Sequence, residues 1–196
     1  ALFPELATTG LAIPSRAAAR RLAEPSDGDT PRRLAALAAE LGMAIGWGFV
    51  EIADDRLFNA ALLVEPGGQR HLYRKRRLYG HDFDWASPGE SPGEFETALG
   101  RVAVVICHDV VYSDIAAESA GADLVLMPTN WIGDPGPEDC LRAFRAPVLV
   151  ADRQGTEDGI RFGDRSGLYP PDGRVLRGTP GVDWKRRVPG AGGRGR

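Results

Sequence analysis

The segment 102–131 constrains the fold more than any other part of this chain. It begins with VAVVI, a β-branched apolar run typical of a buried strand, and Cys107 follows directly. A helix-compatible stretch over 113–120 and a second apolar run within 123–128 come next. Strands that alternate with helices in this way indicate an α/β layered fold.

The other periodic segments fit the same class. Residues 31–41 predict an amphipathic helix, since a proline stands at its start, leucines recur on one face and Gly42 follows it. Segment 76–95 is expected to be an irregular loop. Further helices are expected at 17–22 and 138–145, further strands at 43–51, 57–64, 71–73 and 147–151, and a closing hairpin at 167–176. We expect one domain over 1–178 and a divergent, disordered tail over 179–196.

Composition narrows the class of function. A net charge of −3 over 196 residues gives no electrostatic case for binding nucleic acid or an anionic membrane. No apolar run approaches the ~20 residues of a spanning helix, and no secretory leader is visible. The two cysteines, Cys107 and Cys140, do not make a disulfide framework. These features predict a cytoplasmic protein.

Three polar residues stand at or just past expected strand ends. Glu51 closes the run MAIGWGFVE, Lys75 follows HLYR, and Cys107 follows VAVVI. Strand ends are where side chains converge into sites in α/β sheets. A carboxylate can take a thiol proton, an ammonium can stabilise an oxyanion, and a thiolate can attack a carbonyl. The alternative is an inert, buried Cys107 with Glu51 and Lys75 as a surface pair.

Five motifs in order extend this set. FPEL (3–6) stands before Gly10, GFVE (48–51) before FNAALLVEPGG (58–68), and YRKRRLYG (73–80) before SPGE (87–90). VAVVICHD (102–109) then precedes GADLVLMPTNW (121–131), and FGDRSGLYPPDGRVL (162–176) closes the series. Together they resemble the nitrilase superfamily of carbon–nitrogen hydrolases, from residue 1 to about 178.

The resemblance implies an α–β–β–α sandwich and a glutamate–lysine–cysteine site. Carried onto this chain, Glu51 would be the general base, Cys107 the nucleophile, and Lys75 the oxyanion stabiliser alongside the backbone N–H of His108. The implied reaction is hydrolysis of a small-molecule amide or N-carbamoyl substrate through a thioester, with release of ammonia or an amine. It needs no metal or organic cofactor. Family members are commonly oligomers, so a homo-oligomer is expected.

The resemblance also suggests pocket residues. Counting back from Pro88 places the family's second glutamate at Asp82, with Asp84 as the alternative. Trp131 and Trp85 could line the substrate pocket. His108 could fill a tyrosine's structural place or form a dyad with Cys107. A metal site built from His81 and its two neighbouring aspartates lacks any recognised ligand spacing.

Cys107-His108-Asp109 is similar to the Cys-Tyr-Asp of the amidase and carbamoylase branch, which leaves a nitrilase as the runner-up. Two departures from the family pattern stand out. The resemblance implies a first strand and helix before the FPE loop, which we expect this chain to lack, and Ser113-Asp114 stands where the family has Pro-Glu. A truncated, non-catalytic remnant of the family is therefore the hypothesis of a different class.

Overall fold

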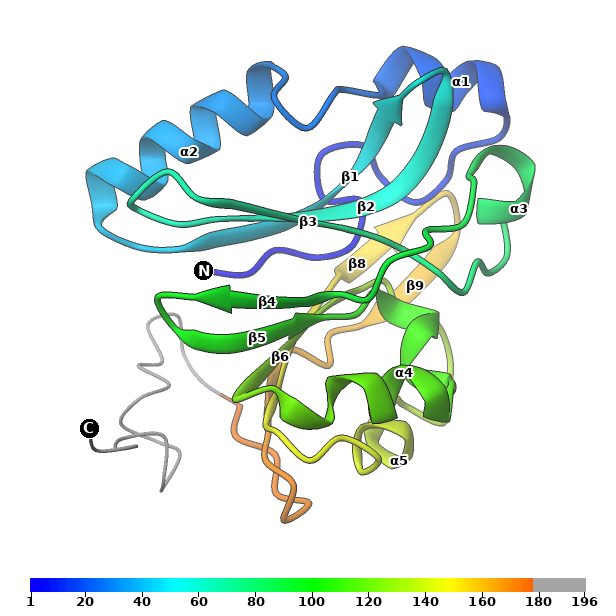
Figure 1. Ribbon diagram of the computed structural model, residues 1–196. Coiled ribbons are helices and arrows are strands. Elements are labelled where there is room, and N and C mark those ends of the chain that lie inside the picture. Colours follow the sequence, from blue (N-terminus) through cyan, green and yellow to red (C-terminus); the bar gives the residue numbers. More distant parts are fainter. Residues whose placement is uncertain (178–196) are drawn as a thin grey trace.

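Two β-sheets lie face to face, and helices cover the outer face of each (Figure 1). The computed structural model describes residues 1–177, so the expected tail at 179–196 lies outside the described part. The order of layers is helix, sheet, sheet, helix, which confirms the α–β–β–α sandwich.

The first sheet is a three-stranded antiparallel meander in the order β1-β2-β3. Register follows from two tight connections, which pair Glu51 with Phe58 and Ala60 with Arg74. Residues that face one another across an antiparallel pair share a face of the sheet, so these pairings fix which side each residue faces. The strands are β1 (Ile45–Ala53), β2 (Arg56–Val64) and β3 (Arg70–Arg74).

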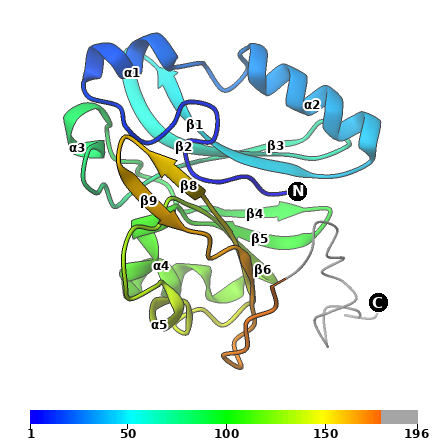
Figure 2. The same ribbon diagram turned by 180° about the vertical axis from the view of Figure 1, so that it is seen from behind.

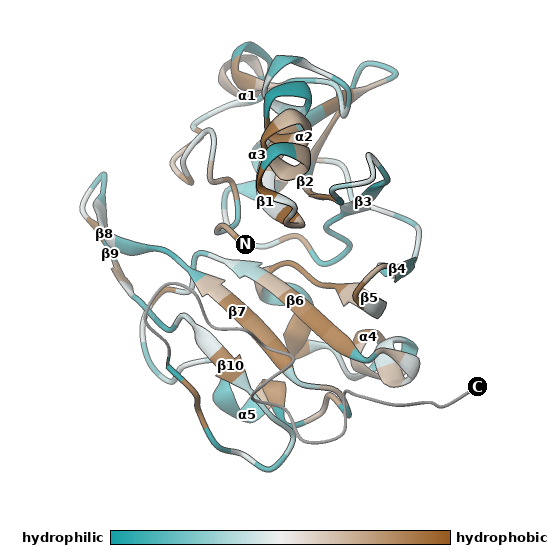
Figure 3. Cartoon of the chain, turned by 90° about the vertical axis from the view of Figure 1, so that its left-hand side faces the viewer, coloured by the Kyte–Doolittle hydropathy of each residue, from teal (hydrophilic) through white to brown (hydrophobic). Residues whose placement is uncertain are grey.

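The second sheet has five strands in the order β10-β7-β6-β5-β4, with a parallel centre (β5, β6 and β7) and antiparallel edges. Its central strands are apolar on both faces, as expected for parallel strands covered on both sides (Figure 3). The strands are β4 (Glu94–Thr97), β5 (Gly100–Val104), β6 (Leu124–Thr129), β7 (Val148–Asp152) and β10 (Gly167–Tyr169).

Apolar side chains fill three interfaces between the layers. Leu63 and Tyr73 of the first sheet meet Val104 and Leu126 of the second between the two sheets. The outer face of the first sheet packs against α2, and that of the second against the α4 and α5 region. The helices are α1 (Arg16–Leu22), α2 (Asp29–Leu41), α3 (Asp82–Trp85), α4 (Ser113–Glu118) and α5 (Glu138–Leu141), with 3₁₀ turns η1 (Cys107–Val111) and η2 (Ser119–Gly121).

A separate hairpin, β8 (Gln154–Glu157) and β9 (Ile160–Gly163), reaches back to the beginning of the chain (Figure 2). Glu157 Oε1 accepts hydrogen bonds from the backbone N–H groups of Leu11 (2.8 Å) and Ala12 (3.0 Å). Arg153 forms an ion pair with the same carboxylate. The hairpin therefore holds the loop that follows the FPEL motif.

The elements largely match the expected ones, with shifts of up to four residues at their ends; the largest is at α5, which ends at Leu141 and not at residue 145. The expected strand 102–106 begins two residues earlier and ends at Val104. The expected loop 76–95 contains helix α3 and the start of β4. The β8–β9 hairpin was not expected from the sequence. Among the helices of residues 1–177, none is both long and apolar enough to cross a bilayer.

Candidate active site

Cys107 occupies a strained corner between strand β5 and the 3₁₀ turn η1. Its φ is +44°, a conformation that costs a non-glycine residue energy and is common at functional sites. Asp109 holds the corner, because its Oδ2 accepts hydrogen bonds from the Ile106 N–H (2.9 Å) and the Tyr73 hydroxyl (2.9 Å). Its Oδ1 accepts from the Arg77 N–H (2.8 Å). The corner thus fixes where the thiol lies.

Lys75 follows β3 and continues its alternation, so its side chain shares the inter-sheet face with Tyr73. The ammonium is 3% exposed and donates to two carboxylates, Glu5 Oε1 and Asp82 Oδ2, each at 2.7 Å. A buried ammonium needs such partners, since desolvation without them is costly. The lysine therefore links two acidic groups that are far apart in sequence.

Glu5 is 1% exposed, and four groups orient its carboxylate and backbone. Oε1 accepts from Asn59 Nδ2 (2.8 Å) and from Lys75. Oε2 accepts from the Asn130 N–H (3.1 Å), and Asn130 Nδ2 donates to the Glu5 carbonyl (3.0 Å). The Glu5 backbone lies on strand β1 at Gly48, whose N–H donates to the Pro4 carbonyl (3.0 Å). The carboxylate is thus held from both sheets.

Glu5, Lys75, Asp82 and Cys107 line one cavity of about 340 Å³. Its polar groups are concentrated around the lysine, and apolar side chains form most of the walls. The lining residues are Glu5, Leu11, Lys75, Tyr79, Asp82, Cys107, His108, Val111, Asn130, Trp131 and Ile132.

The cavity keeps the Cys107 thiol protonated and the Lys75 amine charged. Burial, together with the Glu5 carboxylate, raises the pKa of the Cys107 thiol to about 12, although Lys75 acts in the opposite direction. Burial alone would lower the pKa of Lys75, but Glu5 and Asp82 outweigh it and hold that pKa above its usual value. At neutral pH the free site therefore holds a protonated thiol beside a charged ammonium and needs a base to produce the thiolate.

Glu51 does not join this group, which corrects the expectation that it meets Lys75 and Cys107. It has the same strand parity as Trp47 and Phe49, so its side chain points to the face covered by α2. There its carboxylate accepts two hydrogen bonds from Arg74, at 2.6 and 2.7 Å. The sequence identified a strand-end glutamate, but it could not show on which face of the sheet that glutamate lies.

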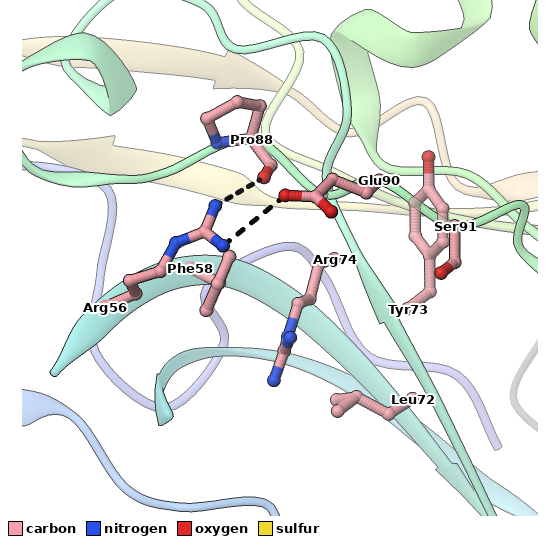
Figure 4. A pocket seen from close by; sticks show the side chains of 9 residues that line it. Arg56, Phe58, Leu72, Tyr73, Arg74, Pro88, Glu90 and Ser91 are labelled. Carbon is pink, nitrogen blue, oxygen red and sulfur yellow. Dashed lines mark hydrogen bonds and ion pairs between the residues drawn. The ribbon is translucent and has the colours of Figure 1, made fainter. Parts of the chain in front are cut away.

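Arg74 also lines a second cavity, of about 260 Å³, on the outer side of the first sheet (Figure 4). The Phe58 ring lies between the guanidinium groups of Arg56 and Arg74, at 4.9 and 4.1 Å from its centroid. Arg56 in turn pairs with Glu90 at 3.4 Å. The cations of this cavity are thus already matched by carboxylates, and neither Lys75 nor Cys107 lines it.

The structure places the other expected residues as follows. Asp82 is 4% exposed beside Lys75, whereas Asp84 is exposed and pairs with His81 at 3.2 Å. Among residues 1–177 no group of three His, Cys, Asp or Glu side chains could hold a metal ion.

Of the two tryptophans expected to line the pocket, one does so. Trp131 lines the cavity, and its indole N–H donates to the Pro135 carbonyl (3.1 Å). Trp85 instead packs in the core near α1. His108 lines the cavity and stacks on Tyr79, with ring centroids 4.6 Å apart.

A family model described as carbon–nitrogen hydrolase matches residues 1–186. The chain belongs to this family. A probable nitrilase of Schizosaccharomyces pombe is 30% identical over 90% of this chain and 69% of that protein. An (R)-stereoselective amidase of a Pseudomonas species is 31% identical over 89% of this chain and 66% of that protein.

A solved structure adds a chemical observation. It is a glutamate-to-glutamine mutant of the amidase from Nesterenkonia sp. AN1, with the acetamide moiety of fluoroacetamide covalently added at its active-site cysteine. It superposes with a TM-score of 0.74 at 25% identity, over 89% of this chain and 70% of that one. This carbon–nitrogen hydrolase chain thus spans about two thirds of the length of these relatives.

Sequence reasoning missed three residues of the site: Glu5, Asn59 and Asn130. FPEL is similar to a loop motif of the family, and it also places a glutamate between Pro4 and Leu6 in an apolar setting. That setting is the signal that could have identified a buried carboxylate. Asn59 lies in an apolar strand run and Asn130 directly follows one, and a polar side chain in such a setting also indicates an internal hydrogen-bond partner.

Proposed function

We propose that this carbon–nitrogen hydrolase cleaves amides at Cys107, with Glu5 as the general base and Lys75 as the oxyanion stabiliser. The observation that carries the proposal is the buried lysine bridge, in which one ammonium bonds both Glu5 and Asp82 in the cavity lined by Cys107. An acid–base group, a cation and a thiol around one enclosed space are what acyl transfer requires.

In the first half of the reaction Glu5 takes the thiol proton and the Cys107 thiolate attacks the amide carbon. The C–S bond forms, and the carbonyl oxygen gains a negative charge that Lys75 and the backbone N–H of His108 stabilise. The C–N bond then breaks, and the proton on Glu5 passes to the departing nitrogen. Ammonia or an amine leaves, and the acyl group remains on sulfur as a thioester.

In the second half Glu5 takes a proton from water, which attacks the thioester carbon. The C–S bond breaks, the carboxylic acid is released and the thiol is restored. Asp82 is a positioning residue in this scheme, because it shares the Lys75 ammonium with Glu5 and accepts the Tyr79 N–H at 3.2 Å. If a neutral residue replaced Asp82, Glu5 would be the remaining carboxylate that bonds the Lys75 ammonium.

The acyl-enzyme step is supported by the related Nesterenkonia amidase, which carries a covalent group on its cysteine. The test is release of ammonia from a panel of primary amides and nitriles, with wild type, Cys107→Ala and Cys140→Ala compared. We expect turnover by wild type and Cys140→Ala, and none by Cys107→Ala. Activity that survives Cys107→Ala would exclude the proposed nucleophile, and faster turnover of nitriles than of amides would favour the nitrilase alternative.

A further inference from the structure

The charged side chains of the active-site cavity carry a net negative charge. Lys75 contributes one positive charge, while Glu5 and Asp82 contribute two carboxylates. Burial and the nearby Lys75 lower the pKa of His108, so its ring is uncharged at neutral pH. Two of the three N–H groups of the Lys75 ammonium donate to these carboxylates, and the third is the one that the proposed reaction assigns to the oxyanion.

Two arginines near the cavity form ion pairs with carboxylates outside it. Arg153 forms an ion pair with Glu157, and its Nη2 donates to the Leu6 carbonyl at 3.4 Å. Arg77 forms an ion pair with Asp114 and lies on the Tyr112 ring. Neither lines the cavity, and among the described residues that do, Lys75 is the one permanent cation.

Apolar side chains surround the mouth of the cavity. Tyr79, Val111 and Ile132 line it while remaining 59%, 48% and 49% exposed. Large apolar groups that stay exposed around a pocket commonly mark a surface that a ligand covers. Leu11 and Trp131 continue the same apolar lining.

We propose that this pocket selects uncharged amides with an apolar side chain and discriminates against amides that carry a carboxylate. The inference rests on the proposed amide hydrolysis. An apolar substituent would be buried against the mouth residues, with a gain that scales with apolar area. A substrate carboxylate would lose hydration and gain no free cation, and it would be repelled by the excess negative charge.

Three amides of similar length separate charge from polarity: hexanamide, glutaramide and glutaramate. The first is apolar, the second carries an uncharged second amide, and the third carries a carboxylate. We expect kcat/KM to fall in that order, with glutaramate at least about tenfold below glutaramide, as repulsion by one excess charge at close range would produce. Equal values for glutaramate and glutaramide would overturn the role of charge.

Variants that neutralise the excess negative charge of the cavity provide the second part of the test. Ile132→Lys and Val111→Lys each place an ammonium at the mouth, and both are expected to raise the glutaramate-to-hexanamide ratio of kcat/KM several-fold. Val175→Lys makes the same charge change at a 40%-exposed valine outside the cavity and should leave that ratio unchanged. An equal rise in all three variants would show that net charge, not the pocket, sets the preference.

The failure of this inference differs from the failure of the proposed function. If wild type hydrolyses glutaramate as efficiently as hexanamide, and both reactions need Cys107, only the selectivity is refuted. If none of the three amides is hydrolysed in a Cys107-dependent reaction, the proposed function fails and the selectivity fails with it.

Discussion

A Cβ atom on Gly48 would lie 2.6 Å from the Cα of Glu5 and 2.4 Å from the backbone nitrogen of Leu6. The loop that carries Glu5 therefore packs directly on strand β1 because residue 48 has no side chain. Real Cβ contacts are not that short, so any side chain at this position must displace the loop.

Gly48→Ala should accordingly impair catalysis more than folding. A shift of the Glu5 carboxylate by a fraction of an ångström to one ångström is expected to lower kcat/KM by about 10- to 100-fold. Gly46→Ala is the matched control, because it lies on the same strand with the same parity and its Cβ would have one close contact, at 2.9 Å, with the flexible end of Leu2. Kinetics and thermal melts of both variants check this; equal activity in the two would contradict it.

Neutralising each of the buried glutamates Glu5 and Glu51 should have a different effect, on catalysis for one and on stability for the other. Glu5→Gln removes the proposed base and is expected to lower kcat by about 10²- to 10⁴-fold. Glu51→Gln removes the ion pair between Glu51 and Arg74. It is expected to cost roughly 1–3 kcal/mol of stability, while kcat per folded molecule stays near wild type. A large loss of kcat in Glu51→Gln with Glu5→Gln active would restore the original assignment of the base.

The raised pKa of Cys107 predicts an alkaline loss of stability. An ordinary thiol has a pKa of 9.0, and in the folded site this rises to about 12. Between those values the unfolded chain releases the proton and the folded chain retains it, so stability falls as pH rises. Compared with Cys107→Ala, wild type should lose up to about 1.4 kcal/mol more per pH unit across that window. Denaturant melts from pH 8 to 11 measure the difference, and parallel curves would refute it.

Asp109 should control the reactivity of the thiol without contacting substrate. Asp109→Asn replaces one acceptor oxygen by an N–H₂ group that must face a donor, either the Arg77 N–H or the Ile106 N–H and Tyr73 hydroxyl. An unsatisfied buried group of this kind costs about 1–3 kcal/mol. We expect a lower melting temperature and slower alkylation of Cys107 by iodoacetamide. Tyr73→Phe removes only one donor and should give a smaller change in both.

Most strands and helices could be predicted from the sequence, but the direction of every side chain could not. Periodicity identified most strands, because central strands such as β6 are continuous apolar runs bounded by turns. The β8–β9 hairpin could not be predicted in this way, because most of its residues are polar and few of them are buried. Cys107 and Lys75 were predictable as residues at strand ends, and the structure brings them to one cavity.

The direction in which the Glu51 side chain points could not be predicted from the sequence. Strand parity states that Glu51 and Phe49 share a face, yet only the packing of α2 decides that this face is turned away from the second sheet. Glu5 escaped notice for the opposite reason, since it stands in an irregular loop with no periodicity to interpret. Its position depends on Asn130, 125 residues further along, which no local pattern contains.

The brace between Glu157 and the backbone of Leu11 spans 146 residues. During synthesis the loop that carries Glu5 leaves the ribosome well before the hairpin that carries Glu157. A nascent chain that already contains Cys107 still lacks the hairpin that fixes this loop. The reactive thiol and its neighbouring acid can therefore be aligned only after long-range folding, which delays chemistry until the hairpin of β8 and β9 has been synthesised.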